Sequence, residues 1–517
     1  MDNLDKLILI NNTEALNTFL SENIQEVFDE LFLSDYDEIK LYSNIINSYY
    51  SLNFRIIKNL DFIRIYNSSF ILLLANFFER FDYPTSFNSI ISLCKRKEIN
   101  ISSRLQAGHL LLKKKTNNQE YIDIYDDILC LLNKAYISEE DDVHMVTYTF
   151  LNYFHKVIND TYQYDCAIAV KLQENVKKSK SEKCYYFLED SIIDYLININ
   201  LNSYSEKESE NLQKRISSCI RRKKKNSTNT TTSQFLVEKD TEYSENLKNI
   251  ECTFQSIRFL SVQQSLKIEK KELIRNSLGR GGSVLTNEEQ LYMYFKSFGN
   301  MHKAKLDSAF QTTTNKFKDN SIEIIDWGCG QALASMVFFE FLTNNQISTN
   351  ISQIILIEPS ELCLKRGALH VVKYNIVNNI KTINKYIDDL IPLDIKTNNT
   401  NIKIHLFSNI LDVEKFSIAK LASLITATQK GRNYFICISP SITNERTDRV
   451  DAFKRHFKNK YKSFEGIFEI NNGGRINDPY WNCNNNYNGN IGVYCNHTEN
   501  GCDKKWTRII QVFKVEI

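Results

Sequence analysis

The sequence predicts a protein of two parts, an all-helical N-terminal domain and a C-terminal α/β domain with a mostly parallel sheet. Glycine and proline are the first sign, because only Gly108 and Pro84 precede Gly279 in the chain. Sheet proteins need such residues in their tight turns, so the first part is expected to be helical. Apolar residues there recur at helical spacing, whereas short apolar runs alternate with helical stretches after about residue 287.

Residues 1–225 carry the helical pattern. Ile24, Val27, Phe28, Leu31 and Phe32 form one amphipathic stripe. Similar stretches cover residues 41–57, 69–81, 86–95, 103–113, 121–135, 143–158 and 184–197. Their lengths suit paired antiparallel helices. Because no repeat occurs at a fixed period, a solenoid and an irregular helical domain both stay open.

A basic run ends this domain, formed by Lys214, Arg215, Arg221, Arg222, Lys223, Lys224 and Lys225. It is either a phosphate-contacting patch or a solvated helix end, and the second interpretation is the simpler one. Residues 226–286 are interpreted as a linker and a connecting helix. Residues 287–517 are the α/β domain, with an insertion at about 471–505.

Composition excludes few functions. The 517-residue chain is 42% hydrophobic and 24% charged with a formal net charge of +2, so no global charge favours nucleic acid or membrane. No apolar run is long enough for a transmembrane helix, and the N-terminus lacks a signal-peptide pattern. The twelve cysteines lie mostly in apolar segments. These features indicate reduced thiols and a cytoplasmic protein without a membrane partner.

The segment from Ile322 to Ser335 carries the main functional signal. An apolar strand ends at Asp326, the chain passes Gly328 and Gly330, and an apolar helix follows. The glycines permit a tight turn and close approach of a ligand, and the helix N-terminus offers unpaired N–H groups. A second apolar strand ends at Glu358, whose carboxylate can accept both hydroxyls of a ribose.

Further strands are expected at residues 380–383, 402–407 and 434–438, and an antiparallel last strand within 506–515. This order resembles the class I S-adenosylmethionine-dependent methyltransferases over about 230 residues, so a Rossmann-like domain is expected. Asp326-x-Gly328-x-Gly330 is similar to their first motif and Glu358 to their ribose-binding acid. Ala332 stands where the third glycine is usual. A dinucleotide site would want glycine where Leu333 stands.

The resemblance implies S-adenosylmethionine as cofactor, with Asp326 pairing with its methionine ammonium. The implied cofactor-binding residues are Asp326, Gly328, Cys329, Gly330, Ala332, Glu358, Pro359, Tyr386, Ile387 and Ser408. A helix before the first strand often covers the methionine end in this family. Tyr294, His302 and Lys303 are the candidates there, and plain packing of that helix on the sheet is the alternative.

The acceptor side is expected after the fourth strand. Ser408 and Asn409 lie at its carboxyl end, where a hydrogen-bond acceptor could orient an amine lone pair. Asp412 is the candidate base, while His405 lies inside the strand and is interpreted as core. These three residues, Ser408, Asn409 and Asp412, are the catalytic candidates.

Two weaker groups lie further along the chain. Cys483, Cys495, His497 and Cys502 could form a structural zinc site, although their spacing matches no Cys-x-x-Cys knuckle and a loop of unpaired thiols is the simpler interpretation. Arg446, Arg449, Lys454 and Arg455, with Tyr480 and Trp481, could bind phosphate and stack a base.

The sequence therefore predicts a methyltransferase acting on a macromolecule, with the helical domain contributing recognition of substrate or protein partner. Nucleic acid is favoured over protein as acceptor because of the two basic clusters. The alternatives are a methyltransferase-like domain that binds a nucleotide without chemistry, and a protein-binding scaffold.

Overall fold

The computed structural model describes residues 2–34, 36–113, 115–137, 143–161, 166–183, 185–201, 204–220, 235–314, 316–377, 379–399, 401–441, 444–472, 497–498, 501–502 and 508–517. The chain divides into two compact units. Unit 1 comprises Met1–Lys225 and Thr443–Asp448, and unit 2 comprises Asn226–Ile442 and Arg449–Ile517. None of the helices in the described ranges combines the length and apolar character needed to cross a membrane.

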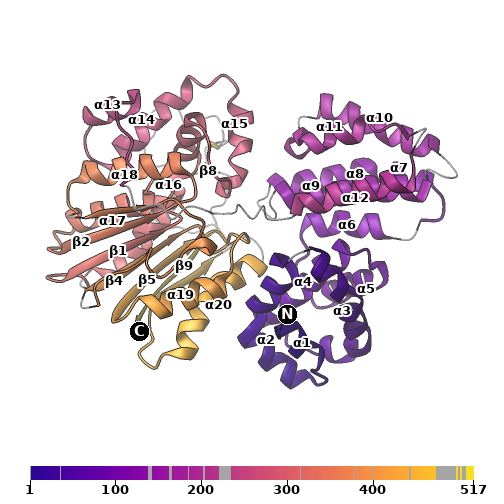
Figure 1. Cartoon of the computed structure of the whole chain (residues 1–517), viewed down its shortest axis with the longest axis horizontal. Coiled ribbons are helices and arrows are strands. Elements are labelled where there is room, and N and C mark those ends of the chain that lie inside the picture. The colour runs from indigo at the N-terminus through magenta and orange to yellow at the C-terminus, as the bar shows by residue number, and fades with distance from the viewer. Residues whose placement is uncertain are drawn as a thin grey trace. The chain divides into compact units, whose positions relative to one another are not determined.

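Unit 1 is helical, as the scarcity of glycine and proline predicts (Figure 1). Its α-helices are α1 (Asp2–Ile8), α2 (Thr13–Phe28), α3 (Tyr36–Ile57), α4 (Ile65–Arg80), α5 (Pro84–Arg96), α6 (Ser103–Leu112), α7 (Gln119–Asp123), α8 (Tyr125–Ile137), α9 (Val143–Thr161), α10 (Cys166–Glu182), α11 (Ser191–Ile197) and α12 (Glu206–Ile220). Neighbouring helices pack in pairs such as α4 with α5 and α6 with α8. A regular repeat among them stays a prediction.

Gly108 of α6 makes room for a buried ion pair. The side chains of Glu79 and Arg104 contact each other and are each 2% exposed. The Thr149 hydroxyl also donates to Oε1 of Glu79 at 2.8 Å. A Cβ atom at Gly108 would lie 3.0 Å from that same Oε1. The glycine therefore lets a carboxylate approach the backbone of α6, where it satisfies the buried guanidinium.

Unit 2 contains a seven-stranded sheet. Its strands are β1 (Ser321–Trp327), β2 (Asn350–Ile357), β3 (Ile380–Ile383), β4 (Ile402–Ser408), β5 (Arg432–Ser439), β6 (Glu465–Asn472) and β9 (Arg508–Glu516), and β7 (His497–Thr498) pairs separately with β8 (Gly501–Cys502). The strand order is β3-β2-β1-β4-β5-β9-β6, and β9 alone runs antiparallel to its two neighbours. This is the Rossmann-like sheet with an antiparallel last strand that the sequence predicts.

Helices cover both faces of the sheet (Figure 1). The helices of unit 2 are α13 (Glu242–Lys248), α14 (Phe254–Leu266), α15 (Lys271–Ser277), α16 (Glu288–Phe310), α17 (Leu333–Asn344), α18 (Glu361–Tyr374), α19 (Ile418–Thr428) and α20 (Asn444–Lys460). Apolar side chains of α14, α16, α17 and α18 share one core with one face of the sheet. Those of α19 and α20 share a second core with the other face. Strands buried on both faces explain the continuous apolar runs in the sequence.

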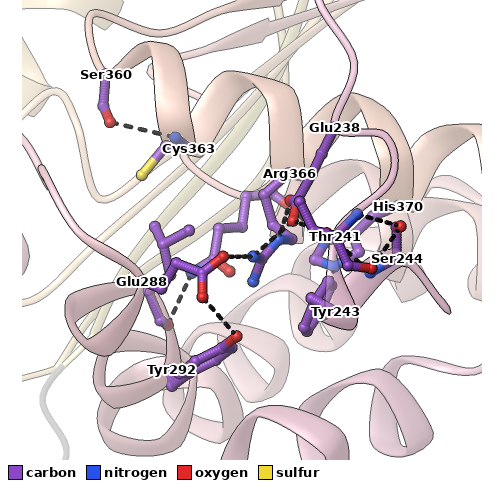
Figure 2. Close-up of polar contacts among 12 residues, drawn as sticks. Glu238, Thr241, Tyr243, Ser244, Glu288, Tyr292, Ser360, Cys363, Arg366 and His370 are labelled. Carbon is purple, nitrogen blue, oxygen red and sulfur yellow. Dashed lines mark hydrogen bonds and ion pairs between the residues drawn. The ribbon is translucent and has the colours of Figure 1, made fainter. Parts of the chain in front are cut away.

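The segment before α13 docks on the sheet domain. The backbone N–H of Leu236 donates to Oγ1 of Thr382 at 2.8 Å, and that of Glu238 donates to the carbonyl of Lys365 at 3.1 Å. Glu238 also forms a bidentate ion pair with Arg366 of α18, whose side chain is 0% exposed (Figure 2). Residues from 235 onward therefore contribute to the stability of unit 2.

Aromatic rings complete the environment of Arg366. Its guanidinium carbon lies 3.5 Å from the ring centroid of Tyr243 and 5.5 Å from that of Tyr292. Glu288, the first residue of α16, adds a second carboxylate at 3.3 Å. A buried guanidinium is tolerated because two carboxylates neutralise it and two rings stack beside it (Figure 2).

We predict that a chain of residues 235–517 unfolds cooperatively and that one of residues 251–517 is less stable by about 3–5 kcal/mol, because the Glu238–Arg366 ion pair and the buried side chains of Tyr243 and Leu247 are lost. Chemical denaturation followed by circular dichroism measures the difference. Equal stability of the two chains would contradict the prediction.

Candidate functional site

The sheet has a switch point at β1. Strand order runs one way from β1 to β2 and β3, and the other way from β1 to β4 and β5. Ligands of open α/β sheets bind at the carboxyl ends of the strands flanking such a point. Here the turn after β1, the end of β2 at Glu358 and the end of β4 at Asn409 meet at that edge.

The turn between β1 and α17 has a left-handed backbone at three positions. The φ angles are +60° at Gly328, +51° at Gly330 and 58° at Ala332. The φ angle favours glycine at Gly328, and a Cβ there would lie 2.9 Å from Cδ1 of Ile410, so that side chain would have to move. At Gly330 a Cβ would meet no atom within 4 Å. The turn is therefore packed against the loop after β4 on one side and open at Gly330.

Asp326 lies beneath this turn with a side chain that is 0% exposed. Its Oδ2 accepts a hydrogen bond from Oγ of Ser335 in α17 at 2.6 Å. Its Oδ1 is buried and has no hydrogen-bond partner among the described residues. Burial raises the pKa of this carboxyl to about 7. A buried acid with one unsatisfied oxygen is suited to a cationic ligand.

Glu358 follows β2 and holds the same turn. Its Oε2 accepts from the N–H of Gly330 at 3.0 Å, and its Oε1 accepts from the N–H of Ser360 at 2.9 Å. Burial raises its pKa to about 7, and the charge of Asp326 contributes in the same direction. The two carboxyls therefore share one site instead of facing opposite sides of the sheet.

Helix α18 supports the turn from behind. A Cβ at Gly367 would lie 3.0 Å from both the nitrogen of Ala332 and the carbonyl oxygen of Gly330. One turn later, His370 lies 2.9 Å through Nδ1 from the carbonyl oxygen of Gln331. Close contact of α18 with the backbone of the turn therefore depends on a residue without a side chain.

His370 links this turn to the Arg366 cluster (Figure 2). Its Nε2 lies 2.7 Å from the hydroxyl of Tyr243, and burial lowers its pKa to about 4. A neutral imidazole has one donor and one acceptor nitrogen. Since a carbonyl only accepts, Nδ1 donates to Gln331 and Nε2 accepts from Tyr243.

Helix α16 covers the site. The rings of Tyr294, Phe298 and His302 contact one another along one of its faces. The ring centroids are 5.2 Å apart for the edge-to-face pair Tyr294–Phe298 and 6.3 Å apart for Phe298–His302. Burial raises the pKa of Tyr294, and the nearby charges of Glu358 and Asp412 add to the effect. A Cβ at Gly281 would lie 3.4 Å from the Tyr294 ring, so the glycine-rich turn at 279–282 packs on that ring.

Lys303 and Lys305 of α16 lie in different surroundings. Lys303 forms an ion pair with Asp307 at 2.8 Å and lies 3.9 Å from Glu340 of α17, outside the site. Lys305, which the sequence analysis does not single out, is 0% exposed and donates from Nζ to Oδ1 of Asn409 at 2.7 Å. Lys305 follows His302 by three residues, and residues at this spacing lie on the same face of a helix. The spacing could therefore have indicated Lys305 from the sequence.

The three catalytic candidates lie together after β4. Ser408 Oγ and Asn409 Nδ2 are buried and have no hydrogen-bond partner within the described ranges. Asn409 has a left-handed φ of 54°, and its N–H donates to the carbonyl of Ile438 at 2.8 Å. Asp412 is 7% exposed and accepts from Oγ of Ser439 at 2.9 Å.

The remaining cofactor candidates lie in the turn after β1 and in the loops after β2 and β3. Cys329 is buried, and burial raises the pKa of its thiol. Asn384 donates to the carbonyls of both Glu358 and Pro359 at 3.0 Å, so the loop after β3 fastens the end of β2. In that loop Ile387 is 8% exposed and Tyr386 is 47% exposed.

His405 is a core residue. It accepts from the Trp327 indole N–H at 3.2 Å through Nδ1, and its Nε2 lies 2.9 Å from Oδ1 of Asn433. Burial lowers its pKa to about 4, so the ring is neutral and Nε2 is the donor to Asn433.

Of the weaker groups, the structure describes the side chains of Arg449, Lys454 and Arg455. Arg449 is 1% exposed and donates to the carbonyls of Leu411, Val413 and Phe416, so it supports the loop after β4 from within. Lys454 pairs with Glu469 at 2.5 Å. The side chains of Arg446, Tyr480 and Trp481, of the basic residues 221–225 and of Cys483, Cys495, His497 and Cys502 lie outside the described residues. Within the described residues no group of three or more His, Cys, Asp or Glu side chains could hold a metal ion.

No family model matches the chain. No curated protein matches it by sequence either. Solved structures of methyltransferases are similar to it at low identity. The plantazolicin methyltransferase BpumL in complex with SAH is 10% identical, covering 50% of this chain and 99% of its own, with a TM-score of 0.27.

Two further structures are similar. A SAM-dependent O-methyltransferase from Thermotoga maritima is 12% identical over 47% of this chain and 71% of its own, with a TM-score of 0.24. A protein from Listeria monocytogenes assigned to the class I S-adenosylmethionine-dependent methyltransferases is 10% identical over 77% and 88%, with a TM-score of 0.28. The Rossmann-like fold of this chain rests on its own strand order and glycine turn.

We predict that Gly367→Ala lowers the free energy of unfolding of the protein by about 1–3 kcal/mol, because the new methyl group meets backbone atoms that cannot rotate away. Gly466→Ala is the matched control, since the nearest atom to a Cβ there is 3.8 Å away on a side chain. Urea denaturation of both variants measures the effect. Similar values for the two would show that α18 does not press on the turn.

Proposed function

We propose that unit 2 binds S-adenosylmethionine and transfers its methyl group. One observation carries the proposal: the buried carboxyl of Asp326 keeps an unsatisfied oxygen beside a glycine turn that is open at Gly330. The ligand expected there is cationic and small enough to lie against backbone. The methionine ammonium of the cofactor meets both requirements.

Glu358 fits the second part of the same ligand. Its two oxygens already accept N–H bonds from Gly330 and Ser360, so the carboxylate is held in place at the end of β2. A carboxylate at this position accepts bonds from ribose hydroxyls in nucleoside-binding sheets of this type. Tyr386 and Ile387, which follow β3, would then border the adenine ring.

The chain contributes alignment and exclusion of water. The cofactor, when bound, supplies a methyl group activated by its sulfonium charge. Tyr294 and the turn at 279–282 cover the crevice, which leaves the transfer largely shielded from solvent. Because Asp326 is 0% exposed, a ligand can reach its carboxyl only if neighbouring residues move.

A macromolecular acceptor is the second part of the proposal, with unit 1 contributing its recognition. The independent helical core of unit 1 supports a binding role separate from chemistry. Nucleic acid and protein are both acceptors to test, since Arg449 of the second basic cluster is buried. Incorporation of labelled methyl groups into cell extract tests the acceptor, because treating the extract with nuclease or with protease removes one class of acceptor. Comparing the full chain with residues 235–517 in the same assay tests the role of unit 1. Equal incorporation by both chains would contradict a role of unit 1 in acceptor recognition.

We predict that Glu358→Gln weakens binding of S-adenosylmethionine by roughly 10- to 100-fold, because hydrogen bonds to a charged group contribute about 1.5–3 kcal/mol. Isothermal titration calorimetry measures the Kd. Glu323→Gln is the matched control, a buried glutamate at the other end of β1 that bonds Asn398 and Asn401. Unchanged affinity in Glu358→Gln would contradict the assigned role.

Cofactor affinity is expected to increase with pH through about 7. The pKa values of Asp326 and Glu358 are raised to about 7 by burial, so both carboxyls are largely protonated below that pH. A cationic ligand favours their ionised forms. As the pH falls below 7, the Kd therefore increases by up to about tenfold per pH unit for each group that must lose its proton.

Calorimetry between about pH 5.5 and 8.5 in two buffers of different ionisation enthalpy measures both the affinity and the protons released. Glu358→Gln is expected to reduce the steepness of the dependence, because one titrating group is gone. A Kd that does not change over this range would show that the ligand does not contact these carboxyls.

A further inference from the structure

The side chain of Asn409 is oriented by Lys305. An ammonium group has only donors, so the amide must present Oδ1 to Nζ, as the 2.7 Å contact shows. The amide nitrogen then faces the other way. The sequence predicts that Asn409 accepts a hydrogen bond from an amine substrate. In the structure its amide oxygen already accepts the bond from Lys305.

The Asn409 amide is thus left with an N–H donor for a ligand. Asn409 Nδ2 is buried and has no partner among the described residues, and the same holds for the hydroxyl of Ser408. Gly328 of the cofactor turn lies against Ile410, the next residue along the chain. The two unsatisfied groups therefore lie beside the place where the methyl group would be delivered.

Two described residues are candidates for a general base here, Asp412 and His302. Asp412 accepts a bond from Ser439, and burial together with the Lys305 charge holds the pKa of His302 well below its usual value. An amine or hydroxyl acceptor would have to lose a proton during transfer. An acceptor that is already an anion needs no base, and it needs donors to hold it.

Resting on the methyltransferase activity proposed above, we propose that the methyl acceptor is a carboxylate, held by the Asn409 amide N–H with the Ser408 hydroxyl, and that the product is a methyl ester. One carboxylate oxygen forms the bond to the methyl carbon. The carbon–sulfur bond breaks, and its electron pair stays on sulfur. Sulfonium cation and carboxylate anion become a neutral thioether and a neutral ester, so no proton is transferred.

The product distinguishes this acceptor from others. Carboxyl methyl esters release methanol in mild alkali, whereas N-methyl groups and methyl ethers do not. The full chain is incubated with cell extract and S-adenosylmethionine labelled in the methyl group, and volatile label is collected after alkali treatment. Most of the transferred label is expected as methanol. Label that stays non-volatile, as methylated nucleic acid or N-methylated protein would give, overturns the proposal.

Asn409→Asp tests the donor itself. The new carboxylate keeps the contact with Lys305 but replaces the N–H with an oxygen that repels a carboxylate acceptor. Formation of alkali-labile product is expected to fall about 100-fold, because the hydrogen bond that positions the charged acceptor is lost and a like charge takes its place. Asn375→Asp is the matched control, an exposed asparagine at the end of α18 with a left-handed φ of 51°.

Calorimetry with S-adenosylmethionine on each variant separates the two proposals. Absence of cofactor binding by the unaltered chain refutes the methyltransferase function itself. Two results would refute the carboxylate acceptor alone. The first is an Asn409→Asp variant that binds the cofactor and transfers methyl groups undiminished. The second is an unaltered chain that binds the cofactor but releases no more methanol in alkali than the Gly330→Trp control.

Discussion

The hydrogen bond from the Gly330 N–H to the Glu358 carboxylate organises the candidate site. It joins the turn after β1 to the end of β2, two segments that are neighbours only because the strands pair in parallel. With Asp326 anchored to Ser335 of α17, the two acids fix both sides of one turn. These bonds help to hold the left-handed backbone at Gly328, Gly330 and Ala332, three alternate positions of the turn.

Buried polar groups outside the site keep this turn in register. The Glu238–Arg366 pair fastens the N-terminal segment of unit 2 to α18, and His370 of the same helix donates to the backbone of the turn. Each group in this set has a specific partner, so a shift of α18 would leave a buried charge or donor unsatisfied. Residues far apart in the sequence, such as Glu238 and Arg366 at a separation of 128 positions, thus help to hold one loop.

The acceptor side depends on electrostatics more than on shape. Lys305 determines which end of the Asn409 amide faces the crevice, because it can only donate. A carboxylate placed in the same position would offer an acceptor, and an unpaired asparagine could turn either way. The identity of one buried cation on a covering helix therefore decides the class of group that the end of β4 can bind.

Much of the fold follows from local patterns. Apolar runs determine the strands, the two glycines and Asp326 determine the turn, and the scarcity of glycine and proline determines the helical unit. These predictions succeed because each rests on a few consecutive residues whose backbone preferences do not need distant contacts. Which of the cofactor candidates contact a ligand stays a prediction.

Only the tertiary structure decided the face of α16. Residues 303 and 305 are two positions apart, which is about 200° around a helix, so one lysine faces Asp307 and Glu340 while the other faces Asn409. The sequence likewise gave no sign that Arg449 is buried and donates hydrogen bonds to three backbone carbonyls. The sequence by itself determined the strands, the turn and the two acids, because those are properties of short segments. The direction of Lys305, the orientation of Asn409 and the docking of residues 235–243 came only from packing, because each depends on which surfaces the folded chain brings together.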